Sequence, residues 1–387
     1  MRKTNIPEGW SKTTLGTFMV FKNGVNAHKD AYGKGIKFVN VMDIFRNNCL
    51  HSDDIAGSVE ITDKQLEEYS VVHGDILFNR TSETQQEIAY SSVYLGEDKI
   101  TFGGFVIRGR QTKQLLLPEF AKYCFKADTI RKEIIRRSQG VVRANIGQKD
   151  LSKVLITIPP LDIQKKFVTI LDEWGRMIEK TEALIYFKER QFEWLQNKLI
   201  RNSFDKWKIE PLKNLSIIKK GQQLNRNTLN YSGAHPVWNG GITPSGYTDT
   251  SNTPANTITI SEGGNSCGFV NYCKEDFWLG GHCYALEKLD SKIDSNFLYF
   301  YLKVNERRIM KLRVGSGLPN IQKKDIVKLL IQFPDLVEQR RIANLLNTAK
   351  HEIDLLTKLA NQYSLQKNGL MQKLLSGEWN IRKKEAA

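Results

Sequence analysis

The sequence predicts an α+β protein: two mixed α/β domains joined by two long helices that form an antiparallel coiled coil, with a pseudo-two-fold internal repeat. The first observation is a duplication, because Trp10–Leu15 recurs as Trp207–Leu212 and Asn145-Ile146 recurs as Asn320-Ile321. A self-match this long indicates two copies of one domain-sized unit, since solenoid repeats have periods of about 20–50 residues. The second observation is that each copy ends in a long heptad pattern of apolar residues.

Each copy is predicted to run from a mixed region into a helical one. Short strand-like runs between glycine-rich turns occur at 37–41 and 75–78 in the first copy, and at 257–260 and 268–272 in the second. An amphipathic helix follows, at about residues 119–138 and 295–312. A glycine-containing loop and a short strand come next, and proline blocks further extension of that strand at Pro159-Pro160 and at Pro334.

The long helices are predicted from an unbroken alternation of four- and three-residue steps. Eight of ten positions stepped from Phe167 are apolar, as are nine of ten stepped from Ile342, so the pattern is a coiled-coil seam. The predicted seam consists of Phe167, Leu171, Trp174, Ile178, Ile185, Phe192, Leu195, Leu199, Ile342, Leu346, Ile353, Leu356, Tyr363, Leu370 and Leu374. A helix of roughly 40 residues is about 60 Å long. Because both seams have equal length we expect them to pair with each other; the alternative is that each pairs with a partner protein.

The composition limits where the protein works. No run of about 18 apolar residues exists, so we expect no membrane span. The N-terminus lacks an apolar signal core, and the five cysteines show no regular short spacing. These features predict a cytoplasmic protein.

Positive charge is concentrated in two matching segments. The net charge is +15, and residues 120–153 and 297–328 each carry a net charge of +6. Duplicated charge of this kind predicts two patches on the protein that bind the phosphates of a nucleic acid. The alternative is a solvated helix face.

Signatures of catalysis are missing. The sequence has no Gly-x-x-x-x-Gly-Lys-Ser/Thr phosphate loop and no Gly-x-Gly-x-x-Gly turn after a strand. Cys267, Cys273, His282 and Cys283 lie close in sequence without the Cys-x-x-Cys spacing usual for zinc, so buried thiols are the preferred interpretation and no metal is expected. We therefore expect binding rather than catalysis.

The candidate DNA-binding residues lie in polar, glycine-rich loops and in the basic segments. Asn can bond adenine and Arg can bond guanine bidentately, while Lys and Arg also contact phosphates. The candidates are Asn23, Asn26, Asn79, Arg80, Arg136, Arg137, Arg143, Asn145, Lys149, Asn239, Asn265, Arg307, Arg308, Asn320, Lys323 and Lys324. The alternative for each is an ordinary turn or helix cap.

The sequence resembles the specificity (S) subunits of type I restriction–modification enzymes. The resemblance lies in the duplicated segments 158–167 and 333–342, each leading into a heptad helix, and in 370–377 at the end of the second helix. Segments 74–80 and 236–241 are also similar to target-recognition sequences of that family. The second copy departs from the first in having Asn256–Ser261 in place of 74–79 and Pro334-Asp335 in place of the double proline.

This resemblance implies two target-recognition domains, 1–158 and 204–333, each reading one half of a split site in double-stranded DNA. It also implies conserved spacer helices at 159–203 and 334–376, followed by a basic tail at 377–387. The helices would dock modification subunits, two of them, which bind S-adenosylmethionine and methylate adenine. A restriction subunit that uses ATP and Mg²⁺ for translocation can join. The chain itself would be non-catalytic and bind no cofactor. The alternative function is a coiled-coil scaffold, or the specificity subunit of a related system that lacks type I restriction partners.

Overall fold

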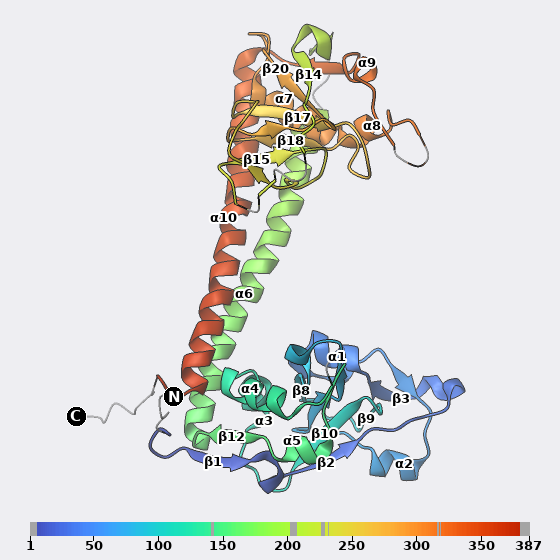
Figure 1. Ribbon diagram of the computed structural model, residues 1–387, viewed down its shortest axis with the longest axis vertical. Coiled ribbons are helices and arrows are strands. Elements are labelled where there is room, and N and C mark those ends of the chain that lie inside the picture. The colour runs from blue at the N-terminus through green and yellow to red at the C-terminus, as the bar shows by residue number, and fades with distance from the viewer. Residues whose placement is uncertain are drawn as a thin grey trace, which may run out of the picture. The chain divides into compact units, whose positions relative to one another are not determined.

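The structure is a computed structural model that describes residues 6–140, 143–201, 207–225, 229–230, 232–315, 317 and 319–379. The chain forms two compact units: unit 1 is Met1–Lys180 with Ala360–Ala387, and unit 2 is Thr181–Leu359. The helices α6 (Leu161–Gln196) and α10 (Leu336–Leu375) each contribute to both units (Figure 1). Of the predicted basic tail, the part from residue 380 onward lies outside the described residues, as do Val141, Val142, Ser316 and Leu318 of the predicted binding loops.

Unit 1 contains a five-stranded sheet in the order β2-β10-β6-β8-β4, a three-stranded sheet in the order β5-β3-β9, and two strand pairs, β1-β12 and β11-β7. Its elements are β1 (Ser11–Thr14), β2 (Met19–Asn23), β3 (Tyr32–Val39), α1 (Val41–Arg46), β4 (Cys49–Leu50), β5 (Ser58–Val59), α2 (Asp63–Glu68), β6 (Ile76–Asn79), β7 (Thr81–Ser82), β8 (Ser91–Tyr94), β9 (Thr101–Phe102), β10 (Val106–Gln111), α3 (Pro118–Cys124), α4 (Asp128–Arg137), β11 (Ala144–Asn145), α5 (Gln148–Ser152) and β12 (Leu155–Ile158).

Unit 2 repeats this plan with a four-stranded sheet in the order β14-β20-β17-β18, a three-stranded sheet in the order β16-β15-β19, and the pair β13-β21. Its elements are β13 (Lys208–Pro211), β14 (Ile217–Lys220), β15 (His235–Trp238), β16 (Tyr247–Thr248), β17 (Thr257–Ser261), β18 (Val270–Cys273), β19 (Trp278–Leu279), β20 (Cys283–Glu287), α7 (Ser295–Val304), α8 (Glu306–Met310), α9 (Lys323–Ile326) and β21 (Leu330–Phe333).

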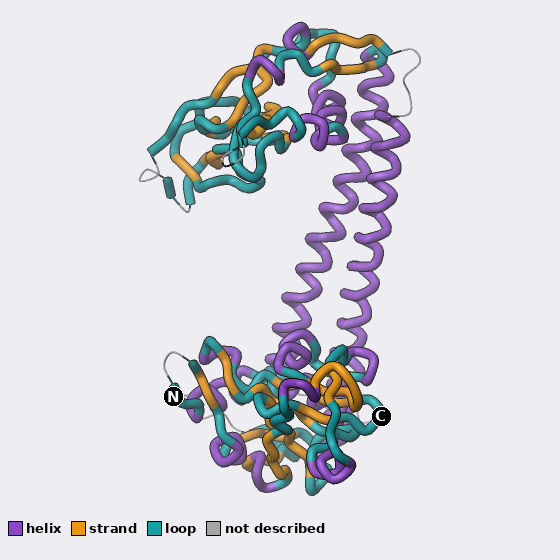
Figure 2. The backbone as a smooth tube through the Cα atoms, turned by 90° about the vertical axis from the view of Figure 1, so that its right-hand side faces the viewer, coloured by secondary structure: helices purple, strands orange, loops and turns teal. Residues whose placement is uncertain are grey.

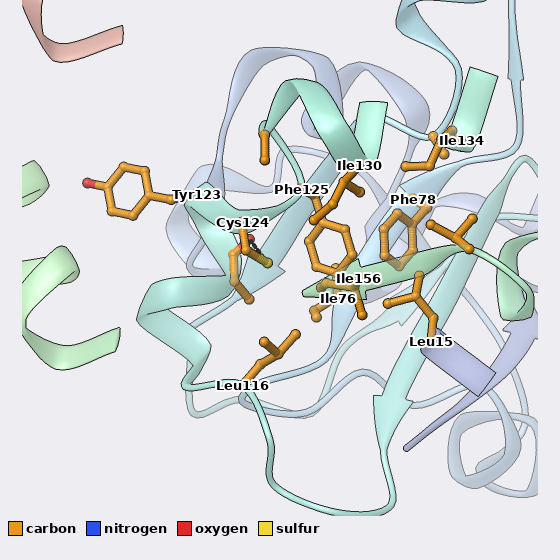
Figure 3. Close-up of a cluster of buried hydrophobic side chains, with 14 of the residues drawn as sticks. Leu15, Ile76, Phe78, Leu116, Tyr123, Cys124, Phe125, Ile130, Ile134 and Ile156 are labelled. Carbon is orange, nitrogen blue, oxygen red and sulfur yellow. Dashed lines mark hydrogen bonds between the residues drawn. The ribbon is translucent and has the colours of Figure 1, made fainter. Parts of the chain in front are cut away.

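The core of unit 1 lies between the five-stranded sheet and the helices that follow it. Figure 3 shows the ring of Phe78 of β6 next to that of Phe125, which follows α3. The ring centroids are 5.0 Å apart and meet edge to face, a favourable aromatic geometry. The central strands β6 and β17 are buried along their whole length, although Thr and Ser alternate with Ile in β17.

The predicted amphipathic helices at 119–138 and 295–312 are each broken into two, so the prediction of single helices was wrong. In unit 1, Ala127 has an extended backbone (φ −60°, ψ 131°), and this ends the α-helical hydrogen-bonding pattern between α3 and α4. In unit 2, the Asn305 side chain donates a hydrogen bond to the Tyr301 carbonyl at 2.8 Å, in competition with the backbone. The apolar periodicity carries through both breaks, so it could not reveal them.

The two long helices pair in an antiparallel direction, as the seam predicts. In unit 1, Trp174 of α6 meets Tyr363 near the end of α10, with ring centroids 5.8 Å apart. In unit 2, Lys188, later in α6, forms an ion pair of 2.7 Å with Glu352, earlier in α10. Figures 1 and 2 both show the helices side by side. After Gln196, α6 continues as a π-helical turn, Asn197–Arg201.

The seam residues near the helix ends also belong to the unit cores. Phe167 and Leu171 pack into the core of unit 1 together with Leu374, and Ile342 and Leu346 pack into the core of unit 2. Apolar packing therefore joins each mixed region to the helix pair beside it.

A buried glutamine fixes each mixed region to the first turn of its helix. The Gln164 side chain accepts a hydrogen bond from Leu117 N at 2.8 Å and donates to the carbonyls of Leu115 and Pro159 at 2.8 and 2.9 Å. Gln339 makes the same set in unit 2: it accepts from Asp294 N at 2.8 Å and donates to the carbonyls of Lys292 and Pro334. Both side chains are fully buried. Neither glutamine was predicted from the sequence to have this role.

Candidate nucleic-acid interface

In unit 1, two loops predicted to bind DNA lie side by side at one end of the main sheet. Arg80 follows β6, and its carbonyl accepts a hydrogen bond from Ile146 N at 3.1 Å. Next to it, β7 pairs with β11, with Asn145 opposite Thr81. Asn23, at the end of β2, pairs with Ile107 of β10, which in turn pairs with Phe78 of β6. Asn23, Arg80 and Asn145, which are 57 and 65 positions apart along the chain, are thus brought together at one end of the sheet.

In unit 2, the corresponding loops lie side by side in the same way. The Glu262 carbonyl accepts a hydrogen bond from Ile321 N at 2.8 Å, and Gly263 forms a β-bridge with Asn320. Lys220 pairs with Tyr284, and Tyr284 with Ile260. The strand registers therefore equate Lys220 with Asn23, Tyr284 with Ile107, Glu262 with Arg80, and Asn320 with Asn145.

A close approach of two backbone segments supports this edge in both units. A Cβ atom at Gly24 would lie 2.2 Å from the Gly103 carbonyl oxygen, and one at Gly221 would lie 2.1 Å from that of Gly280. Any side chain would clash, so only glycine fits at these two positions. The duplicated glycines found in the sequence thus have the same physical cause in each unit.

Most candidate residues present exposed side chains. The exposed candidates are Asn26, Arg80, Arg136, Arg143, Asn145, Lys149, Asn265, Arg307, Arg308, Asn320, Lys323 and Lys324. Among the described residues, the Arg80 guanidinium has no hydrogen-bond or ion-pair partner. Arg136 forms an ion pair of 2.7 Å with Glu133. An exposed cation without a carboxylate partner is the kind that can contact a phosphate or a base at low desolvation cost.

The remaining candidates are half-buried or buried and carry local structure. Asn79 is fully buried, and its Nδ2 donates to the Thr81 carbonyl at 3.1 Å, while its Oδ1 has no partner among the described residues. Asn239 accepts a hydrogen bond from His282 N at 3.1 Å. Half-buried Arg137 lies 3.4 Å from Glu133, and Asn23 is also half-buried. In this conformation Asn79 does not reach solvent, and Asn239 is partly exposed while its side chain supports the loop at His282.

Part of the basic charge in these segments points inward. The Arg131 guanidinium donates to the carbonyls of Gln86, Ile88 and Ala89 at 2.5–3.1 Å. Burial, and secondarily the nearby charge of Lys367, lowers the pKa of Lys126 to about 8. Lys303 forms an ion pair of 2.6 Å with Glu306. Counting charges along the sequence therefore overstates the cations available at the surface.

The cysteine cluster of unit 2 has no metal-binding geometry. Across the described residues, no group of three or more His, Cys, Asp or Glu side chains is arranged to hold a metal ion. Burial raises the pKa of the Cys273 and Cys283 thiols to about 12, so both are neutral at physiological pH. No described helix is long and apolar enough to cross a membrane.

Comparison with known proteins identifies the family. The model of the type I restriction modification DNA specificity domain matches residues 7–185 and 205–363. A protein of Mycoplasma pneumoniae named a type I specificity subunit is 36% identical over 164 residues, which cover 42% of this chain and 44% of that protein. A protein of Methanocaldococcus jannaschii named a type I restriction enzyme specificity subunit is 24% identical, over 97% of this chain and 95% of that protein.

Solved structures share the fold. The type I restriction–modification S subunit from M. genitalium aligns with a TM-score of 0.62 at 18% identity, over 96% of this chain and 98% of that one. The HsdS subunit of Thermoanaerobacter tengcongensis aligns with a TM-score of 0.56 at 18% identity, over 98% and 99%. With two copies of the domain covering most of its length, the chain belongs to the type I restriction–modification DNA specificity family, whose role is recognition of the DNA target.

Proposed function

We propose that each unit reads one half of a bipartite site in double-stranded DNA, and that α6 and α10 dock two modification subunits. Methyl transfer from S-adenosylmethionine to adenine then takes place in those subunits, and ATP- and Mg²⁺-dependent restriction in a further subunit. The chain itself is a non-catalytic reader that works in the cytoplasm, where its DNA target is. The observation that carries this proposal is that in both units the same two loops pair with each other at one end of the main sheet. The side chains on these loops differ between the two units.

The chemistry of the edge supports DNA as its ligand. In unit 1 the exposed side chains of Arg80, Arg143 and Asn145 lie on the two adjoining loops. In unit 2, the exposed side chains of Asn320 and Lys323 lie on the corresponding segment, which pairs with Gly263. Guanidinium, ammonium and carboxamide groups are the side chains that bond phosphates and base edges. The strands and glycine turns on which these loops are built hold them in place, and a site that recognises bases needs such rigidity.

The differences between the copies support two unlike half-sites. The strand registers equate Asn23 and Arg80 of unit 1 with Lys220 and Glu262 of unit 2. The repeat that aligns Asn145 with Asn320 equates Gln148 with Lys323. The hydrogen-bonding groups thus differ at all three positions, while the backbone plan is shared. Because base readout depends on donor and acceptor patterns, identical half-sites are not expected.

The helices carry an apolar surface suited to partner subunits. On the part of α6 within unit 2, Leu184, Phe187 and Trp194 are 43, 67 and 58% exposed. Beside them a groove of about 490 Å³ lies between α6 and α10, lined by residues that include Phe192 and Leu345. Exposed aromatic stripes at helical spacing mark surfaces on which partner helices pack.

Selection of bound fragments from a randomised DNA library tests the proposal. The full chain, with modification subunits added, is expected to enrich two short motifs separated by a fixed gap. A single motif, or none at low salt, would contradict two-part reading and favour a scaffold. Incubation of the chain alone with DNA and labelled S-adenosylmethionine is expected to give no methylated DNA, and methyl transfer without partners would overturn the non-catalytic assignment.

A further inference from the structure

Unit 2 contains a polar triad at its loop edge that unit 1 lacks. Glu262 Oε1 accepts a hydrogen bond from Lys220 Nζ at 2.7 Å and another from the Tyr284 hydroxyl, also at 2.7 Å. The three side chains come from β14, β20 and the residue after β17, so they span three adjacent strands. Burial, and then the bond to Glu262, raises the pKa of Tyr284, so its hydroxyl keeps its proton.

The triad is buried at one end and open at the other. The Glu262 side chain is 6% exposed, whereas the Lys220 side chain is 53% exposed. Tyr284 is buried. The carboxylate is thus fixed inside the protein, and the lysine that it holds reaches the surface with N–H donors to spare.

Stability of the fold does not account for this arrangement. Buried ion pairs can often be replaced by apolar groups at no cost in stability. Unit 1 keeps the same backbone plan without this ion pair, because Asn23 stands in place of Lys220 and Ile107 in place of Tyr284. There the position of Glu262 is taken by Arg80, which is exposed.

We infer that Lys220 is a base-reading residue for the half-site of unit 2, that Glu262 and Tyr284 are its positioning residues, and that a guanine edge is its ligand. This inference rests on the proposed function. A lysine that contacts only phosphates needs no fixed orientation, because phosphate charge attracts it from many directions. A lysine held by a buried carboxylate presents its donors along defined directions, which suits the O6 and N7 acceptors of guanine. Its charge is partly balanced by Glu262, so it adds less to non-specific attraction.

The test is selection from the randomised DNA library with the assembled complex, comparing Lys220→Ala, Glu262→Gln and Arg80→Ala with the native chain. Lys220→Ala is expected to reduce the preference at one base pair of one half-site by about ten- to a hundredfold. Glu262→Gln should weaken the same preference, and Arg80→Ala should change only the other half-site.

The matched control is Lys219→Ala on the same strand. Lys219 pairs with Ala285 in the register, one residue away from Lys220, so its side chain points to the opposite face of the sheet. It also carries its own ion pair, of 3.0 Å, with Glu287. This control is expected to leave both half-sites unchanged.

The outcomes separate the inference from the proposed function. If the native complex enriches no split motif, the proposed function fails before the variants are compared. If the native motif is split but Lys220→Ala leaves it unchanged, or weakens all sequences equally, Lys220 is not a base reader. The inference also fails if Lys220→Ala and Arg80→Ala alter the same half-site. Unchanged preference at the other base pairs of the same half-site shows that the mutated unit is folded, which separates loss of structure from loss of base reading.

Discussion

The buried side chains of Gln164 and Gln339 provide a direct test of how each mixed region is attached to its long helix. Replacing Gln164 with Met keeps most of the side-chain volume and removes its three hydrogen bonds. The Leu117 N–H and the carbonyls of Leu115 and Pro159 then lose their partner inside the protein. An unsatisfied buried polar group costs about 1–3 kcal/mol, and the added apolar contact of Met offsets part of the sum. We expect a net cost of about 3 kcal/mol for opening this junction.

Hydrogen exchange followed by mass spectrometry measures that cost locally. A loss of about 3 kcal/mol corresponds to roughly a hundredfold faster exchange through local opening. In Gln164→Met the increase should appear in peptides covering 115–124 and the first turn of α6, with peptides 292–304 of unit 2 unchanged. Gln339→Met should give the reverse pattern. Exposed Lys165 lies in the same turn as Gln164, and Lys165→Met serves as the control with no change.

An exchange rate in Gln164→Met within twofold of the native rate would refute this reasoning. It would mean that apolar packing of Phe167 and Leu171 alone fixes the helix to unit 1. A uniform increase over both units would also refute it, because the glutamines would then act on global stability rather than on their own junctions.

Three further predictions concern DNA, partners and pH. Arg307→Ala and Arg308→Ala are expected to weaken binding to all DNA sequences and to lower the slope of log K against log salt by about 0.9 each, measured by fluorescence anisotropy; Arg136→Ala and Arg137→Ala should have smaller effects, because Glu133 lies beside both side chains. Equal slopes for all four variants and the native complex would assign these segments to protein or solvent. Phe187→Ala with Trp194→Ala is expected to reduce the occupancy of modification subunits seen by native mass spectrometry, with an unchanged melting temperature; undiminished occupancy would exclude this stripe as the docking surface. Burial lowers the pKa of Lys126 to about 8 in the folded chain, so the unfolded chain binds the proton more tightly and the group destabilises the fold most below pH 8. Lys126→Met should therefore be more stable than the native chain by about 2–3 kcal/mol at pH 7, a gap that narrows as the pH rises toward 10 in urea unfolding, and a gap independent of pH would show that the lysine is solvated.

Much of the architecture followed from patterns that depend only on local periodicity. The heptad steps from Phe167 and Ile342 predicted two long helices, because a seam must recur every 3.5 residues to face one partner. The duplication predicted two units of one plan, and Gly24 and Gly221 recur because a side chain would strike a carbonyl oxygen in each. The breaks at Ala127 and Asn305 escaped prediction, since the core-facing apolar residues continue on both sides of them.

The candidate site was predicted less completely, because its members come from distant segments. Proximity of Arg80 to Asn145 depends on the pairing of β7 with β11, which neither segment encodes alone. The polar composition of the loops singled out Asn79 and Asn239, but it could not show that Asn79 is buried or that Asn239 accepts a hydrogen bond from His282 N. Lys220 and Tyr284 were missed for the converse reason, because each lies in an ordinary strand sequence. Glu262 lies in a glycine-rich loop just after β17, but no short motif links it to the other two residues.

The sequence by itself determined the repeat, the heptad seam and the family, because these are properties of residue order along one chain. The tertiary structure alone decided which polar groups reach the surface of each reader. Strand pairing places Glu262 beneath Lys220 in unit 2 and leaves Arg80 without such a partner in unit 1. Burial and pairing depend on neighbours that are far away in sequence. Two units with the same net charge in their basic segments therefore present different cations: Lys220 held by Glu262 in unit 2, and Arg80 without such a partner in unit 1.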